Sequence, residues 1–410
     1  MKRGFLALAI VCAVGFAAGN AGAAPPDEPL IVISIDGFRA DYFDRHLTPA
    51  LAAIATDGVH AKAMHPSFPS VTSPNHYTLM TGLRPDHHGI VDNGFLDPAI
   101  PGESFGEGSK DTTDPRWWAK ATPLWVTAAH AGLRTAESHW PGGDAIVKDT
   151  DFTYHDKSGW NTPPDTETDT VLGWVDLPAN KRPQLILLHY DPVDSMGHVF
   201  GPDSPQVNAA IGQVDAAIAR LVDGLRTRGL YDRINLVIVS DHGMTDLTAN
   251  PPGYVLDTLI NIDDVTVSIQ GADAGIWPKP GHEAEVEKAL IATPHPHMTC
   301  WHKKDIPASL HYGSNPRVPP ILCLGDLGWS IVTAATLKKY PNHLHGNHGY
   351  DPAFPDMWAV FFAHGPAFRR GVTLEPFDNV DVYPLLAKLL GVAPQANDGT
   401  LADTAAALKN

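Results

Sequence analysis

The segment LIVISID, at residues 30–36, is a short apolar run that ends directly on an aspartate. Three more runs of this kind follow, at residues 185–190, 234–240 and 357–362. Short apolar runs bounded by turn residues are typical of strands inside an α/β sheet, because helices cover both faces of such a sheet. We therefore predict an α/β fold in which these four runs are strands of one central sheet.

Acidic and imidazole side chains lie next to all four runs. In an α/β sheet, side chains that follow the strands collect in a crevice outside the carboxyl ends. We therefore expect three aspartates and three histidines to converge there, and such oxygen and nitrogen ligands suit two borderline divalent cations. The sequence thus predicts a two-metal hydrolase. The six residues are Asp36, Asp194, His198, Asp241, His242 and His348.

Two of these six positions have competitors. Asp194 and His198 are four residues apart, a spacing that places both on one face of a helix. Asp191 lies in the same segment and competes with Asp194 as the carboxylate ligand. In the segment HGNHGYDP, His345 competes in the same way with His348. The residue pattern alone leaves both alternatives open.

The segment PSVTSPNHYTL, at residues 69–79, is typical of a loop that enters a helix, because Pro74 suits the first helical turn. The amino terminus of a helix offers free N–H groups and partial positive charge to an anion. A hydroxyl at this position, next to a metal that lowers its pKa, becomes a nucleophile. We predict that Thr72 is this nucleophile, with Ser70 and Ser73 as competitors.

Asn93, in the segment VDNGF, could place an amide donor on an oxygen of a phosphoryl group. On its own, an asparagine ahead of Gly94 is more typical of a turn. Its functional role is therefore a prediction that depends on a wider pattern.

The length and charge of the chain limit its organisation and its partners. At 410 residues it exceeds the usual size of a single hydrophobic core. We expect a catalytic domain at residues 24–245 and 341–410, with an inserted α+β cap subdomain at residues 246–340. The formal net charge of −17 would repel a nucleic-acid polymer or an anionic membrane. A small anionic substrate remains compatible, because bound cations invert the local field.

The amino-terminal segment has the features of a secretory signal peptide. A basic start, MKRG, precedes an apolar stretch at residues 5–18 and the tripeptide AGA at residues 21–23. The stretch is shorter than the roughly 20 apolar residues that a membrane span requires. We therefore expect residues 1–23 to be a signal peptide and the product to be exported, periplasmic or secreted, without a stable membrane anchor.

Two cysteines, Cys300 and Cys323, lie beyond this segment. In an oxidising compartment an even pair is expected to form a disulfide. Catalytic or metal-binding thiols are the alternative.

Five motifs follow one another along the chain: IDGFRADY with Asp36, VTSPNHYTLMTGLRPDHHGIVDN with Thr72 and Asn93, DSMGHVFGP with Asp194 and His198, DHGM with Asp241 and His242, and HGNHGYDP with His348. Together, and in this order, they resemble the nucleotide pyrophosphatase/phosphodiesterase family of the alkaline phosphatase superfamily. The resemblance spans about residues 28–395 and is highly specific. It identifies the chain as an expected exported bacterial member of that family.

The resemblance implies an alkaline-phosphatase-like fold, with a mixed, mostly parallel central sheet flanked by helices. It also implies two zinc ions. One would be held by Asp194, His198 and His348, and the other by Asp36, Asp241 and His242. Thr72 would bridge toward both ions, and Asn93 would hold a phosphate oxygen. The implied reaction cleaves phosphodiester or phosphoanhydride bonds of small molecules through a covalent phosphothreonine and releases nucleoside monophosphates.

One residue departs from the family pattern. The family usually has a phenylalanine after the nucleophile, where it forms one wall of a slot that stacks a base, whereas this chain has Ser73. Loss of a stacking wall removes about 1–3 kcal/mol per base. Tyr154 is the expected opposite wall, and Phe95 or Trp160 could substitute for it.

Other functions of the same superfamily therefore remain alternatives. They are hydrolysis of choline-phospholipid diesters, of phosphomonoesters or of phosphonates. A monoesterase would need an arginine that clamps phosphate, for which Arg39 and Arg84 are the candidates. A non-catalytic zinc scaffold or an anion-binding protein is a third possibility, but structural zinc sites usually contain cysteine, and these ligand sets have none.

Overall fold

The computed structural model describes residues 29–106, 110–159, 161–248, 253–339 and 344–409. The predicted signal peptide lies outside these residues. None of the helices in the described ranges has the length and apolar character that crossing a membrane requires.

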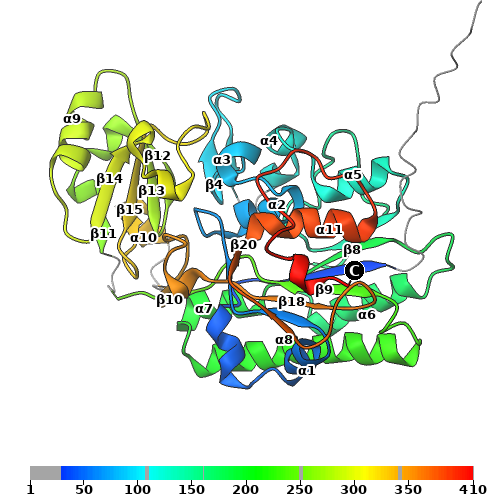
Figure 1. Cartoon of the computed structure of the whole chain (residues 1–410). Helices are drawn as coiled ribbons and strands as arrows, with labels where there is room; N and C mark the ends of the chain where they lie inside the picture. Colours follow the sequence, from blue (N-terminus) through cyan, green and yellow to red (C-terminus); the bar gives the residue numbers. More distant parts are fainter. Residues whose placement is uncertain (1–28, 107–109, 160, 249–252, 340–343, 410) are drawn as a thin grey trace, which may run out of the picture.

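An eight-stranded mixed sheet forms the centre of the molecule, in the order β19-β2-β18-β9-β1-β8-β6-β7 (Figure 1). The central strand β1 runs parallel to β8 and β9, whereas β18 is antiparallel to β9 and β2. The predicted mixed, mostly parallel sheet is therefore confirmed. The strands are β1 (Leu30–Ile35), β2 (Val59–Ala61), β6 (Thr135–Ser138), β7 (Tyr154–His155), β8 (Leu185–Tyr190), β9 (Asn235–Val239), β18 (Phe361–His364) and β19 (Val372–Leu374).

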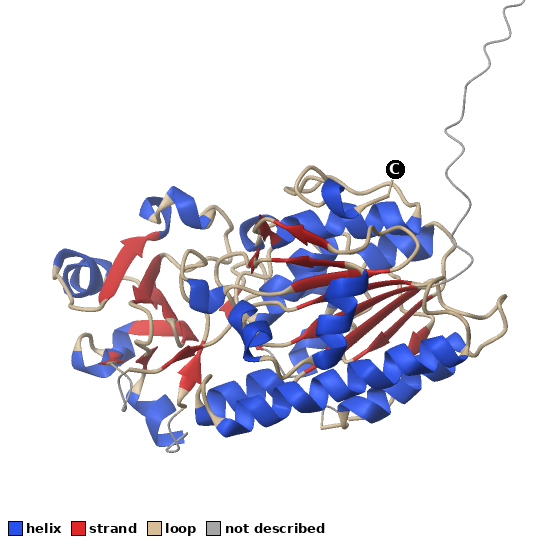
Figure 2. Cartoon of the chain, turned by 60° about the horizontal axis from the view of Figure 1, so that its bottom comes forward, coloured by secondary structure: helices blue, strands red, loops and turns tan. Residues whose placement is uncertain are grey.

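Helices cover both faces of this sheet, as the apolar runs predict. On β1, Ile31 and Ile33 pack against one set of helices, whereas Leu30 and Val32 pack against the other. Figure 2 shows the longest helix, α8, lying along the first face. The first set is α1 (Pro49–Asp57), α6 (Pro164–Val175) and α8 (Pro205–Thr227), and the second is α2 (Thr72–Thr81), α5 (Leu124–His130) and α11 (Val382–Leu390).

Of the four predicted strands, the one at residues 357–362 differs most from the observed bounds. Residues Pro355–Met357 form a 3-10 turn, and β18 begins only at Phe361 and continues to His364. Hydrophobicity alone does not separate a buried turn from the strand that follows it, because both bury their side chains.

A second, four-stranded antiparallel sheet lies beside the central one (Figure 1). A disulfide joins Cys300 to Cys323, which face each other on adjacent strands, so the predicted pairing is confirmed. We call the described residues 253–339 the cap region; its boundaries as a subdomain stay a prediction. Its sheet has the order β12-β13-β15-β14 and comprises β12 (Val265–Gln270), β13 (Asp273–Pro278), β14 (Met298–His302) and β15 (Ile321–Gly325), next to helix α9 (Glu283–Glu287).

Polar anchors attach the cap region to the catalytic part. The carboxylate of Asp86 accepts hydrogen bonds from the backbone N–H groups of Gly313, Ser314 and Asn315, at 2.8–3.1 Å. The buried guanidinium of Arg317 donates to Asp97 at 2.7 Å and to three backbone carbonyls. Since both charged groups are fully engaged, the cap region has a defined position next to the central sheet.

Candidate active site and metal centre

The carboxyl edge of the central sheet brings the six predicted metal ligands together. Asp36 directly follows β1, and Asp241 and His242 lie just past β9. Helix α7 (Pro192–Phe200) begins two residues after β8 and carries Asp194 and His198. His348 follows the short strand β17 (Gly346–Asn347). These residues are buried, apart from the half-buried His198, and we call them the metal-type cluster.

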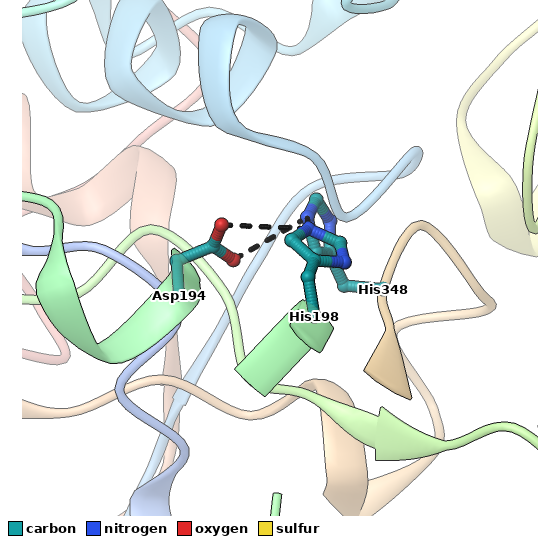
Figure 3. A group of neighbouring side chains, drawn as sticks. All are labelled: Asp194, His198 and His348. Carbon is teal, nitrogen blue, oxygen red and sulfur yellow. Dashed lines mark hydrogen bonds and ion pairs between the residues drawn. The ribbon is translucent and has the colours of Figure 1, made fainter. Parts of the chain in front are cut away.

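Asp194, His198 and His348 form the first group of ligand-type atoms (Figure 3). The Nε2 atoms of His198 and His348 lie 3.0 Å apart. The carboxylate of Asp194 faces both rings, with Oδ2 at 3.4 Å from His198 and Oδ1 at 3.5 Å from His348. All three side chains thus point at one small volume.

In both histidines, the ring nitrogen that points away from the cluster carries the proton. Nδ1 of His198 donates to the carbonyl of Gly346 at 3.0 Å, and Nδ1 of His348 donates to that of Ser70 at 2.9 Å. A carbonyl only accepts, so each neutral ring carries its proton on Nδ1 and leaves Nε2 as a lone pair. Two facing lone pairs beside a carboxylate repel one another unless a cation lies between them. This arrangement fits a metal ion, with carbonyls that orient the ligating rings.

Asp36, Asp241 and His242 form the second group. Nε2 of His242 lies 3.0 Å from Oδ2 of Asp241 and 3.5 Å from Oδ1 of Asp36. Its Nδ1 donates to the carbonyl of Gly243 at 2.9 Å, which again leaves Nε2 facing the carboxylates. The rings of His242 and His348 stack with centroids 3.6 Å apart, so the two groups are contiguous.

The cluster carries more negative charge than its described surroundings neutralise. Among the described residues, nothing donates a hydrogen bond to Oδ1 of Asp194 or to Oδ2 of Asp241, although both atoms are buried. Burial raises the pKa of Asp194. Burial acts to lower the pKa of His242, but the negative charge of Asp241 and Asp194 raises it to about 9, because this space favours a positive charge, whether a proton on the ring or a metal ion in its place. Buried carboxylates are stable when paired or metal-bound, and a cysteine-free set of nitrogen and oxygen donors fits a divalent cation such as zinc.

Two buried histidines support the cluster, and the sequence reasoning missed both. His189, on β8, donates from Nε2 to Oδ2 of Asp36 at 2.9 Å. His76, on α2, contacts the carbonyl of Thr72 at 2.9 Å and the hydroxyl of Ser34 at 2.8 Å. Burial lowers the pKa of both rings, so they are neutral and orient their partners through hydrogen bonds. The sequence offered two features by which they could have been found. His76 lies four residues after Thr72, and His189 is a polar residue inside an apolar strand.

Thr72 is the first residue of α2, as the sequence predicts, and Val71 caps the helix. Its hydroxyl lies 3.3 Å from Nε2 of His242, so it contacts the metal-type cluster. The competing hydroxyl of Ser70 is fully buried and donates to the carbonyl of Tyr350 at 2.9 Å. Ser73 is buried beside Thr72 on the same helical turn. The geometry favours Thr72 over Ser70 as the nucleophile.

Asn93 lies next to this helix terminus. Its side-chain carbonyl accepts a hydrogen bond from the backbone N–H of Ser73 at 2.9 Å. The bond orients the amide, whose NH₂ group is not used by any other described residue and can donate to a ligand. The structure therefore places Asn93 beside Thr72.

The remaining candidates lie outside the cluster. Asp191 accepts a hydrogen bond from Ser195 at 2.6 Å, and His345 is exposed. Arg39 pairs with Asp41 at 2.6 Å, and Arg84 pairs with Asp378 at 2.7 Å. Each has another partner or faces solvent, so none competes structurally with the six residues.

The predicted walls of a base slot are not assembled around Thr72. Tyr154 lies on the edge strand β7, beside Ala136, and its hydroxyl donates to the carbonyl of Lys181, which precedes β8. Phe95 is buried and stacks on Phe105 with ring centroids 4.7 Å apart. Trp160 lies outside the described residues. The substrate-binding roles of Ser73 and Tyr154 stay predictions.

A cavity of about 300 Å³ opens beside the second group of ligands. His189, which contacts Asp36, forms part of its wall. Other lining residues include His139, Glu167, Asp191, Ser195 and Gln213. Its lining mixes polar side chains with prolines and Met196, and it adjoins the cluster through His189.

Comparison with known proteins gives consistent matches over most of the chain. The family model described as type I phosphodiesterase/nucleotide pyrophosphatase matches residues 30–351. The chain is 36% identical over 377 residues to human ectonucleotide pyrophosphatase/phosphodiesterase family member 5, covering 92% of this chain and 77% of the relative. It is 34% identical over 393 residues to a venom phosphodiesterase of Naja atra, covering 93% of this chain and 46% of the relative. The solved structure of murine ectonucleotide pyrophosphatase/phosphodiesterase 5, an inactive variant in complex with AMP, matches with a TM-score of 0.88 and 34% identity, covering 93% of this chain and 100% of that chain.

Proposed function

The chain belongs to the type I phosphodiesterase/nucleotide pyrophosphatase family and is a hydrolase of that family, and from this premise we propose that it is a two-zinc enzyme that uses Thr72 as a covalent nucleophile. The proposed substrates are small phosphodiesters and phosphoanhydrides, including nucleotides, from which a nucleoside monophosphate is released. The single observation that carries the proposal is the contact of the Thr72 hydroxyl, at the start of α2, with the metal-type cluster.

Each group of ligands would hold one ion. Asp194, His198 and His348 would hold the first, and Asp36, Asp241 and His242 would hold the second. Two bound divalent cations would neutralise phosphate oxygens and lower the pKa of the attacking hydroxyl.

The residues of the chain perform the remaining tasks. Oγ1 of Thr72 attacks the phosphorus in line, the bond to the leaving group breaks, and a phosphothreonine diester forms. The N–H groups at the start of α2 and the amide of Asn93 hold the non-bridging oxygens, where negative charge develops. Water then attacks the phosphorus from the opposite side, Thr72 recovers its proton, and a phosphate monoester leaves.

Replacing the hydroxyl tests this proposal. We expect Thr72→Ala to lower kcat on an aryl phosphodiester by about 10³-fold or more, because no nucleophile remains, while the zinc content stays close to that of the wild type. Thr72→Ser should restore part of the activity, and Ser70→Ala is the matched control because its hydroxyl is bonded away from the cluster. Full turnover by Thr72→Ala would move the nucleophile to Ser73.

Ser73 favours a second candidate activity, on diesters without a base. A hydroxymethyl group offers no face on which a base could stack. We expect comparable kcat/KM on an aryl nucleotide diester and on a simple alkyl-aryl phosphodiester, measured beside a phosphocholine aryl ester and a matched monoester. A nucleotide diester preference of 10-fold or more would show that base recognition survives without the phenylalanine. A dominant monoester rate would overturn the phosphodiesterase assignment.

Export is part of the proposal. The disulfide between Cys300 and Cys323 supports an oxidising compartment, periplasmic or extracellular. Amino-terminal sequencing of the mature protein tests cleavage after Ala23, which lies outside the described residues.

A further inference from the structure

A loop of the cap region holds the segment that carries Asn93. The loop is residues 312–317, which we call the clamp loop, and the segment is residues 89–97, which we call the Asn93 segment. Arg317 of the clamp loop donates to the carbonyl of Gly89 at 2.6 Å and to the carboxylate of Asp97 at 2.7 Å. Gly89 and Asp97 lie four residues before and four residues after Asn93. One guanidinium therefore binds both ends of the segment at whose centre Asn93 lies.

Tyr312, at the start of the clamp loop, adds a contact closer to Asn93. Its hydroxyl donates to the carbonyl of Val91 at 2.9 Å, two residues before Asn93. The Tyr312 ring packs edge-on against the ring of Phe68, with centroids 5.2 Å apart. Phe68 lies four residues before Thr72. Tyr312 thus contacts both the Asn93 segment and the loop that leads to the proposed nucleophile.

Both side chains of the clamp loop are buried, so these contacts constrain the Asn93 segment. Arg317 is 2% exposed and Tyr312 is 7% exposed. The guanidinium also lies over the ring of Phe95, 5.3 Å from its centroid. A buried charge that loses its partners is destabilising, so the bonds of Arg317 are maintained in the folded protein. The clamp loop is itself held by Asp86, which accepts hydrogen bonds from three of its backbone N–H groups.

At its centre, the Asn93 segment is joined to the helix that carries the proposed nucleophile. The side-chain carbonyl of Asn93 accepts a hydrogen bond from the backbone N–H of Ser73 at 2.9 Å. Ser73 is the second residue of α2, so its N–H is satisfied from outside the helix. The geometry of this bond depends on where the Asn93 segment lies, and so does the direction of the NH₂ group of Asn93.

We infer that Tyr312 and Arg317 of the cap region are positioning residues, which orient the amide of Asn93 toward a phosphoryl oxygen of the substrate. They contact the Asn93 segment and act on the reaction only through it. The cap region then contributes to catalysis, although its clamp loop supplies no catalytic residue. The inference rests on the proposed role of Asn93 in holding a non-bridging oxygen.

A double-mutant cycle on the zinc-loaded enzyme tests whether Tyr312 acts through Asn93. We expect Asn93→Ala to lower kcat on an aryl phosphodiester by about 100-fold, as removal of one oxyanion donor does. Tyr312→Phe should lower kcat about 5-fold with little change in KM, because Asn93 acts on charge that develops during the reaction. In the Asn93→Ala background, Tyr312→Phe should have almost no further effect, since residues that act as one unit are not additive.

Two further variants separate positioning from packing. Tyr254→Phe removes a hydroxyl that donates to the carbonyl of Pro296, inside the cap region and away from the clamp loop, and it should leave kcat unchanged. Arg317→Lys keeps the charge but not the planar fork, and it should lower kcat in the same non-additive way as Tyr312→Phe. Additive losses from Asn93→Ala and Tyr312→Phe would overturn the inference and leave the role of Asn93 intact. Unchanged kcat in Asn93→Ala would instead overturn the proposed role of Asn93.

Amide hydrogen exchange gives a readout that needs no activity. The N–H of Ser73 is held by Asn93 rather than by a helical carbonyl, so its protection reports on the position of Asn93. We expect the peptide that contains Ser73 to exchange about 5-fold faster in Tyr312→Phe than in the wild type, and at the wild-type rate in Tyr254→Phe. Equal exchange in these two variants would overturn the inference. If the wild type hydrolyses no phosphodiester but this difference in exchange is present, the proposed function fails and the positioning of Asn93 stands.

Discussion

The metal-type cluster and the polar anchors of the cap region both bury aspartates, yet their neighbours differ. In the cluster, the carboxylates face imidazole nitrogens whose protons are directed away toward carbonyls. At the anchor, Asp86 accepts hydrogen bonds from three backbone N–H groups of the cap region, and Asp97 accepts from the guanidinium of Arg317. The first surroundings supply further lone pairs and suit a metal ion, whereas the second supply the N–H donors that a carboxylate needs. The partner of a buried carboxylate is thus set by the groups around it rather than by its burial.

The largest effect should come from making the same substitution, a carboxylate replaced by an amide, in each of the two regions. We expect Asp241→Asn to lower kcat/KM by about 10³-fold and to reduce bound zinc, because an amide is a poor ligand in a site that needs negative charge. Asp86→Asn should leave bound zinc unchanged, because Asp86 bonds the cap region rather than the cluster. Metal analysis of both variants after dialysis is the measurement. A loss of zinc in Asp86→Asn would remove the distinction between the two regions.

A smaller effect is expected where a neutral side chain supports the cluster. His189→Gln keeps a donor near Asp36 but alters its position, and loss of such support typically weakens metal affinity by about 10–100-fold. Competition with a chelator of known affinity measures the change. His155→Gln is a matched control, because this ring bonds Glu137 and Asp151 rather than the cluster. Equal affinities for the two variants would assign His189 a packing role only.

The sequence predicts the site best where chemistry coincides with the ends of strands. Asp36, Asp241 and Asp194 could be found because each follows an apolar run, and a parallel sheet gathers such positions at one edge. His189 could not, because it lies within an apolar run and its partner Asp36 is 153 residues away. The start of β18 was also missed, because a buried turn precedes it.

Contacts between the cap region and the catalytic part are harder still to predict. Asp86 and its partners in the cap region are 227–229 residues apart in the sequence, and no periodic pattern links them. The stacking role of Tyr154 stays a prediction for the same reason: its aromatic ring suits stacking, while strand pairing places it beside Ala136, away from the carboxyl edge. A side chain's chemistry can be read from its identity, whereas its neighbours depend on how distant segments pack.

The disulfide has a consequence for producing this protein. It joins neighbouring strands of one sheet within the cap region, whereas the anchors to the catalytic part are the carboxylate of Asp86 and the guanidinium of Arg317. A chain synthesised in a reducing cytoplasm therefore lacks the covalent link between two strands of the cap region. It keeps the hydrogen bonds of Asp86 and Arg317, which attach the cap region to the catalytic part. Thiol reagents should therefore lower the local stability of the cap region before they lower the rate of catalysis.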